Sequence, residues 1–219
     1  MKRTLLSVVL CGSVWACGGG SDNNGTPTAP TPPAPAANQP PSITALSISS
    51  FGIQQLSQFN FSASATDPNG DALTYTWDIA GNAASGSSGT ITFSVGGSGT
   101  ARVTVTDGKG GTATDTRTFT VGSMTGTWRG SYPGFNFTSN LTQSGNRVSG
   151  DYADALGTGR LDPDFANTID SDGNVVLRYK QGIFLDFTLR GRMDQSGRTI
   201  SGGIFGSGYN GEAFTMTKQ

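Results

Sequence analysis

The amino-acid sequence predicts an all-β protein, with a β-sandwich followed by a small antiparallel meander β-barrel. Three observations support this prediction. Apolar and polar residues alternate with period two over short segments, turns rich in glycine and asparagine separate these segments, and no stretch shows the 3.6-residue period of a helix. In residues 59–65, for example, Phe59, Phe61, Ala63 and Ala65 share one face, and asparagine and serine occupy the other.

Residues 1–16 have the layout of a secretory signal peptide. Lys2 and Arg3 precede an apolar run that is far shorter than the ~20 residues that a membrane-spanning helix needs. Cys17 follows the small residue Ala16 and precedes a stretch of glycine and serine. This segment resembles the lipobox of bacterial lipoproteins. The resemblance implies cleavage before Cys17 and a lipid anchor on its side chain, with an ordinary signal peptide as the alternative.

The same resemblance implies a location. No aspartate directly follows the cysteine, and in lipoprotein sorting this pattern implies the outer membrane in a cell that has one. Residues 17–41 consist mainly of Gly, Ser, Asn, Thr, Ala and Pro. Such a segment cannot bury an apolar core, so it is predicted to be a disordered linker between the anchor and the first folded domain.

Composition excludes several classes of function. The chain contains no histidine, and both of its cysteines lie within the first 17 residues, so the folded part has neither a thiol nucleophile nor a disulfide. Loss of Lys2 and Arg3 with the signal leaves 12 basic and 15 acidic residues, a net charge of −3. Because no basic cluster is present either, nucleic acid is not expected as a partner. We expect no enzymatic activity.

Residues 42–122 are predicted to form the β-sandwich. The sequence Ala65-Thr-Asp-Pro-Asn-Gly-Asp-Ala-Leu-Thr-Tyr-Thr-Trp-Asp78, together with Val105-Thr-Asp-Gly-Lys-Gly-Gly111, resembles the PKD repeat. Bacterial cadherin-like and other Ig-like surface modules share much of this pattern, and a cadherin-like module is the alternative. Either resemblance implies an Ig-like β-sandwich, and it extends over about residues 39–122.

Residues 124–219 are predicted to form the β-barrel. The sequence from Gln143 to Gly150 recurs in similar form from Gln195 to Gly202, 52 residues later, and each copy reads as a strand end, a Ser-Gly turn and a new strand. Evenly spaced hairpins suggest an up-and-down meander, and closing the meander would remove its exposed edges. The opening Gly126-Thr-Trp128 weakly resembles that of a lipocalin-type barrel.

The strongest constellation for metal binding combines Asp67, Asn69 and Asp71 with Asp107. Oxygen ligands at every second position of a turn, with a carboxylate from another loop, suit Ca²⁺. In the alternative interpretation these side chains only hydrogen-bond the backbone of their own turns. The aspartates between residues 162 and 172 are interpreted as a polar hairpin loop.

Exposed aromatic residues are the other candidates for ligand binding. Trp77 and Trp128 lie in alternating strands and are expected in the core, whereas Tyr209 lies in the glycine-rich segment 206–211 and is a candidate for contact with a ligand.

The sequence therefore predicts a membrane-anchored envelope or surface lipoprotein. It would act as a non-catalytic binding, adhesion or display module for polysaccharide or protein. The alternatives are a carrier that holds a small apolar ligand in its barrel, and an accessory subunit of a polysaccharide-degrading system.

Overall fold

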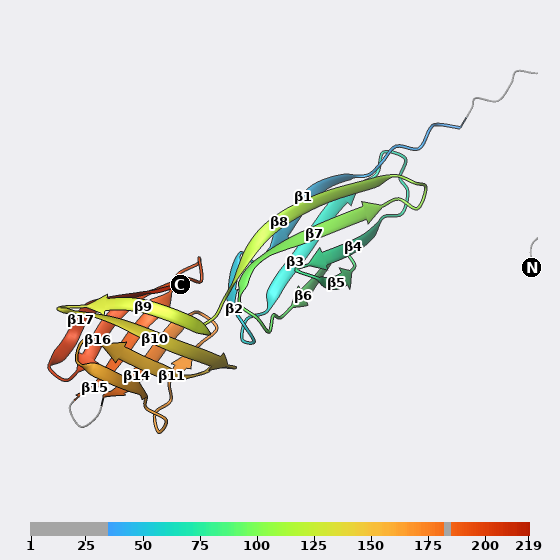
Figure 1. Ribbon diagram of the computed structural model, residues 1–219. Coiled ribbons are helices and arrows are strands. Elements are labelled where there is room, and N and C mark those ends of the chain that lie inside the picture. The colour runs from blue at the N-terminus through green and yellow to red at the C-terminus, as the bar shows by residue number, and fades with distance from the viewer. Residues whose placement is uncertain (1–34, 182–184) are drawn as a thin grey trace, which may run out of the picture. The chain divides into compact units, whose positions relative to one another are not determined.

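The computed structural model describes residues 35–181 and 185–219, except for the side chains of Gln181 and Leu185 (Figure 1). The signal segment and Cys17 lie outside the described residues. Residues 37–219 form one compact unit. Every regular element in the described part is a strand, which confirms the all-β prediction, and this part holds no helix that could span a membrane.

Two sheets form the predicted sandwich. A three-stranded sheet has the order β1-β3-β6 and a five-stranded sheet has the order β2-β8-β7-β4-β5. All neighbours are antiparallel except β2 and β8, which are parallel. The strands are β1 (Ser42–Ile48), β2 (Phe51–Ile53), β3 (Phe59–Thr66), β4 (Thr74–Ile79), β5 (Asn82–Ser85), β6 (Ser88–Ile91), β7 (Gly97–Thr106) and β8 (Thr112–Gly122).

The core of the sandwich follows the alternation in the sequence. Phe59, Phe61 and Ala63 are buried on β3, while the residues between them are exposed. The ring of Phe59 lies edge-on to that of Phe93, with centroids 5.0 Å apart, and Trp77 is 4% exposed. These aromatic side chains share the core between the two sheets with aliphatic residues such as Ile79, Val103 and Val105.

Nine further strands close into the predicted barrel. They are β9 (Gly126–Tyr132), β10 (Phe135–Ser144), β11 (Arg147–Asp154), β12 (Gly157–Leu161), β13 (Thr168–Ile169), β14 (Asn174–Gln181), β15 (Leu185–Met193), β16 (Thr199–Gly206) and β17 (Tyr209–Lys218). The sheet order is β10-β9-β17-β16-β15-β14-β12-β11, and β10 also pairs with β11, so the sheet closes. β12 and the short β13 both lie between β11 and β14 and together complete an eight-stranded barrel.

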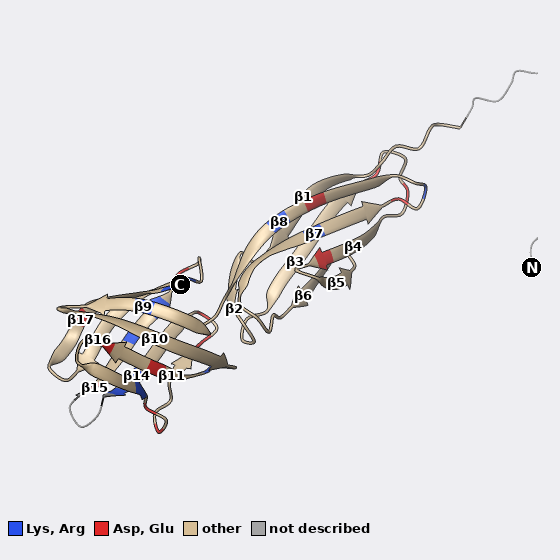
Figure 2. Cartoon of the chain, in the orientation of Figure 1, with Lys and Arg blue, Asp and Glu red and all other residues tan. Residues whose placement is uncertain are grey.

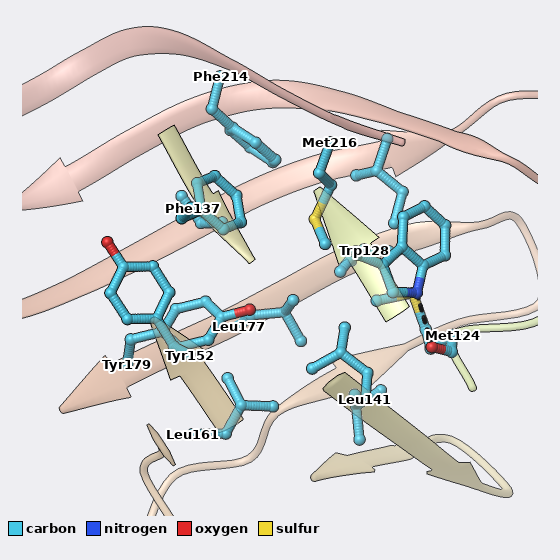
Figure 3. Close-up of a cluster of buried hydrophobic side chains, with 14 of the residues drawn as sticks. Met124, Trp128, Phe137, Leu141, Tyr152, Leu161, Leu177, Tyr179, Phe214 and Met216 are labelled. Carbon is cyan, nitrogen blue, oxygen red and sulfur yellow. Dashed lines mark hydrogen bonds between the residues drawn. The ribbon is translucent and has the colours of Figure 1, made fainter. Parts of the chain in front are cut away.

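The interior of the barrel is packed with large side chains (Figure 3). Trp128 is fully buried and its indole Nε1 donates a hydrogen bond to the carbonyl of Met124 at 2.8 Å. The residues that pack around it from the other strands include Phe137, Leu141, Tyr152, Leu177, Tyr179, Leu189, Ile200, Phe214 and Met216, all at most 3% exposed. An eight-stranded barrel is just wide enough to be filled in this way.

The two similar segments 52 residues apart both form hairpins, as predicted. Ser144 pairs with Arg147 around a tight turn in which Gly145 has a φ of 57°, a conformation that glycine adopts without steric cost. In the second copy, the backbone N–H groups of Arg198 and Thr199 donate to a carboxylate oxygen of Asp194.

The filled interior leads to the first testable prediction. An environment-sensitive apolar dye or a fatty-acid probe, titrated into residues 37–219, is expected to show no saturable binding at micromolar concentration, because Trp128, Tyr152 and Phe214 already occupy the volume that a ligand would need. Fluorescence titration measures this directly. Saturable one-to-one binding would mean that the interior opens, and would favour the carrier function.

Candidate binding site on the outer face of the barrel

The outer face of strands β17, β9 and β10 carries polar side chains in two rows. Alternation along β9 points Trp128 and Tyr132 inward and leaves Arg129 and Ser131 exposed. The antiparallel register then aligns Thr217, Arg129 and Thr138 across the three strands, and Thr215, Ser131 and Asn136 in the next outward row.

These two rows line a groove of about 610 Å³, which we call the polar groove. Hydroxyl, amide and guanidinium groups line it, together with the small side chain of Ala153 and with Asp154 from β11. Phe137 and Gly130 also contribute to its lining, and a Cβ atom at Gly130 would lie 2.4 Å from the Phe137 ring. The groove therefore offers many hydrogen-bond donors and acceptors, which suits a ligand rich in hydroxyl groups.

A hydrogen-bonded cluster of two tyrosines adjoins the groove at Asp154. The hydroxyls of Tyr132 and Tyr152 are 2.9 Å apart, and both donate to Oδ2 of Asp154, at 3.1 and 2.5 Å. The other oxygen, Oδ1, accepts the backbone N–H groups of Leu156 and Gly157. The carboxylate thus fixes the β11–β12 turn and the end of the inner core at the same point.

Burial keeps both phenols protonated. Desolvation raises the pKa of Tyr132 to about 12, and it raises the pKa of Tyr152 further still, with the Asp154 hydrogen bond acting in the same direction. At neutral pH neither tyrosine supplies a phenolate that could act as a general base. The cluster holds the carboxylate of Asp154, which lines the groove, in place.

Tyr209, the ligand-contact candidate from the sequence, lies at the start of β17. It is half-buried, and its ring meets the ring of Tyr132 edge-on with centroids 5.5 Å apart. It therefore packs against the tyrosine cluster and does not line the polar groove. Its contact with a ligand stays a prediction.

The residues that line the polar groove were not identified from the sequence. Arg129, Ser131 and Asn136 are ordinary outward positions of alternating strands, and only the register brings them together with Thr215. The sequence indicates these residues only indirectly. Once Trp128 and Phe137 are assigned to the core, the residues next to them in each strand must face outward.

In the calcium candidate of the sandwich, the carboxylates cap turns. Oδ1 of Asp67 accepts the backbone N–H groups of Asn69 at 2.8 Å and Asp71 at 3.1 Å. Oδ1 of Asp107 likewise accepts those of Lys109 at 2.7 Å and Gly111 at 2.9 Å. These are the hydrogen bonds of Asx-type turns.

The end of the predicted linker connects these two turns. The side-chain amide of Asn38 donates to Oδ2 of Asp107 at 2.8 Å, and the backbone N–H of Gln39 donates to Oδ1 of Asn69 at 2.8 Å. The hydrogen bond from Asn38 lowers the pKa of Asp107, and the backbone N–H groups add to this effect against the opposing effect of burial. Within residues 35–181 and 185–219, no group of three or more acidic side chains is arranged to hold a metal ion.

The comparisons with known proteins concern both β-domains. Residues 38–121 match the model of the PKD domain family, which confirms the PKD resemblance of the sandwich. The PKD1 domain of Vibrio anguillarum Epp is 29% identical, and the match covers 39% of this chain and 96% of that domain with a TM-score of 0.33. A structure from work on promiscuous carbohydrate-binding modules of the β-sandwich superfamily is 12% identical, over 84% of this chain and 93% of its own, with a TM-score of 0.38. No curated protein matches the chain.

Calcium binding by Asp67, Asn69, Asp71 and Asp107 stays a prediction, and a thermal melt tests it. Oδ1 of Asp67 and Oδ1 of Asp107 are occupied by backbone N–H groups, whereas Oδ2 of Asp67 accepts no hydrogen bond from the described residues. If the four residues bind the ion, calcium at about a hundredfold excess over Kd stabilises the domain by about 2.7 kcal/mol. Melts of residues 37–219 in millimolar calcium and in chelator measure the difference. Curves that overlay would assign the four residues to turn formation alone.

Proposed function

We propose that this chain is a non-catalytic binding module of the bacterial cell envelope, anchored by a lipid on Cys17. In this proposal the PKD-like sandwich acts as a spacer or adhesive module, and the barrel presents the polar groove to a polysaccharide or an envelope protein. The observation that carries the proposal is the division of the barrel into a filled interior and a polar outer groove.

The features of the groove favour binding over catalysis. The chain contains no histidine, the phenols of Tyr132 and Tyr152 are held protonated, and the Asp154 carboxylate accepts hydrogen bonds on both oxygens. Groups committed in this way position a ligand but do not exchange protons with it near neutral pH.

The alternatives differ in what is bound and where. A carrier would need an interior cavity, which the packing around Trp128 opposes. An accessory subunit of a polysaccharide-degrading system would use the same outer groove and would differ only in its partner.

The anchoring part of the proposal predicts the mature N-terminus. Mass spectrometry is expected to find a peptide that begins at Cys17 and carries diacylglycerol, because the segment before it resembles a lipobox. Two acyl chains or more hold a protein to membranes through salt washing, whereas a single chain gives only marginal binding. An unmodified N-terminus at Cys17, or a mature N-terminus beyond it, would refute anchoring.

The binding part is tested with a variant that fills the groove. We expect immobilised residues 37–219 to retain polysaccharide or protein from envelope extract, and Thr138→Tyr to reduce retention about tenfold or more, since a large side chain would obstruct the groove. Thr142→Tyr is the matched control, because it adds the same side chain to an exposed position of β10 that does not line the groove. Equal retention by both variants would show that the groove is not the binding site.

A further inference from the structure

Phe205 is an aromatic side chain on the outer face of the barrel. It is 37% exposed, and its ring lies against two glycines. A Cβ atom at Gly203 would lie 3.1 Å from the ring, and one at Gly211 would lie 3.5 Å from it. A side chain at Gly203 would crowd the ring, whereas a Cβ atom at Gly211 would only touch it, so the backbone at these two positions supports the ring.

A β-bulge creates this support. Ile204 pairs with Glu212 and Phe205 pairs with Asn210, so that Gly211 is the extra residue of β17. Gly211 has a φ of 100°, which favours glycine over any other residue. Bulges re-aim side chains and are frequent beside functional sites.

One arginine without an acidic partner among the described residues borders the ring, and a second lies further along the same strand. The guanidinium carbon of Arg190 lies 5.9 Å from the ring centroid of Phe205. Arg192 is the next outward residue of β15, and its Nε donates to the carbonyl of Asp172 at 3.0 Å. Both arginines are exposed, and no carboxylate of the described residues lies within 4.0 Å of either side-chain nitrogen group.

The surface around Phe205 continues into the polar groove. Across the strands, Arg192 pairs with Ser201, Ser201 with Thr215, and Thr215 with Ser131 of the groove. The side chains that bridge the two areas are therefore small and hydroxyl-bearing. A chain-like ligand can pass from Phe205 along β16 over Gly203 to Ser201, and from there along this row into the polar groove.

The face carries three arginines, while the groove is also lined by the carboxylate of Asp154, which is held by the two buried tyrosines. Arg129, Arg190 and Arg192 face outward without an ion pair to any described residue. Of the acidic residues on the same strands, Asp186 pairs with Arg178 on β14, at 2.9 Å, while Glu212 accepts the backbone N–H of Asn210. Charged side chains of both signs also lie on the other barrel strands (Figure 2), among them those of Arg147, Asp151 and Lys180.

We infer that this face binds an acidic polysaccharide. In this arrangement a sugar ring stacks on Phe205, its carboxylate pairs with the guanidinium of Arg190, and the following sugars extend along the serine and threonine row into the polar groove. The inference rests on the proposed function and specifies its ligand class. An aromatic ring matches the apolar face of a sugar, hydroxyl and amide groups match its hydroxyls, and unpaired arginines match its carboxylates.

Polygalacturonate and its neutral methyl ester serve as probes in the test. We expect residues 37–219 to bind the acidic polymer about tenfold or more tightly than the ester, and to lose that preference as salt is raised. Affinity electrophoresis or calorimetry in the presence of chelator gives the two dissociation constants.

Substitutions at Arg190 and Phe205 separate the contribution of the positive charge to binding from that of the aromatic ring. Arg190→Gln is expected to weaken binding of the acidic polymer about tenfold while leaving binding of the ester unchanged, and Phe205→Ala is expected to weaken both. Arg147→Gln is the matched control, because Arg147 is also exposed and without an ion pair to described residues but lies on β11. Melting temperatures check that each variant folds, and Arg190→Gln decides the inference should Phe205→Ala fail to fold.

The possible outcomes distinguish this inference from the proposed function. Equal affinity for polymer and ester, or an unchanged affinity in Arg190→Gln, overturns the acidic ligand and leaves the proposed function standing. Capture of an envelope protein alone, in a way that Thr138→Tyr abolishes, also overturns the inference. A stronger affinity for single-stranded DNA than for polygalacturonate would replace the ligand class altogether.

Discussion

Closure of the eight-stranded sheet is the constraint on which the organisation of the C-terminal domain depends. Pairing of β10 with both β9 and β11 leaves no long free edge, so every strand has two hydrogen-bonded neighbours. The same closure fixes the interior volume, which the side chains around Trp128 fill. Because the folded part contains no cysteine, these contacts provide the stability that disulfides provide in many exported domains. The inward residues are thus committed to folding, and the polar side chains of the groove are outward ones.

Several aspartates of the chain also serve the fold, because their carboxylates stabilise turns. Asp67, Asp107, Asp170 and Asp194 each accept backbone N–H groups within their own turns. Aspartate suits this purpose because its short side chain reaches the N–H groups two to five residues further on. At the oxygen that accepts these N–H groups, a metal ion must compete with hydrogen bonds that already define the turn. Acidic residues spaced by two along a sequence therefore indicate a turn first, and a metal site only when further ligands converge on them.

The sequence predicted which segments form strands and which of their side chains face the core. It did not predict which side chains from different strands come together. Alternation alone placed Phe59 and Phe61 in the core of the sandwich, and the repeated Ser-Gly segments located two hairpins of the barrel. Both are local properties, with a period of two residues or a turn of a few. The contact between Tyr132 and Asp154 depends on which strands become neighbours and in which register. Register is a property of the closed sheet, and for that reason the polar groove was absent from the sequence-based candidates.

Phe205 is a single residue whose role could not be predicted from the local alternation of the sequence. Its position in the alternation of β16 places its side chain on the outer face. The alternation alone does not show whether an aromatic residue at such a position truly faces outward or whether the strand has been assigned a register that is off by one residue. The surrounding glycines carry the missing information. Gly203 gives the ring room on its own strand, and Gly211 forms the bulge that makes room for it on β17. Glycine inside a strand weakens it, so folding alone does not call for glycine at both positions beside Phe205. Most of the surface of the ring is buried and contributes to packing, and the 37% that is exposed beside the guanidinium of Arg190 is the surface that the proposed ligand would contact.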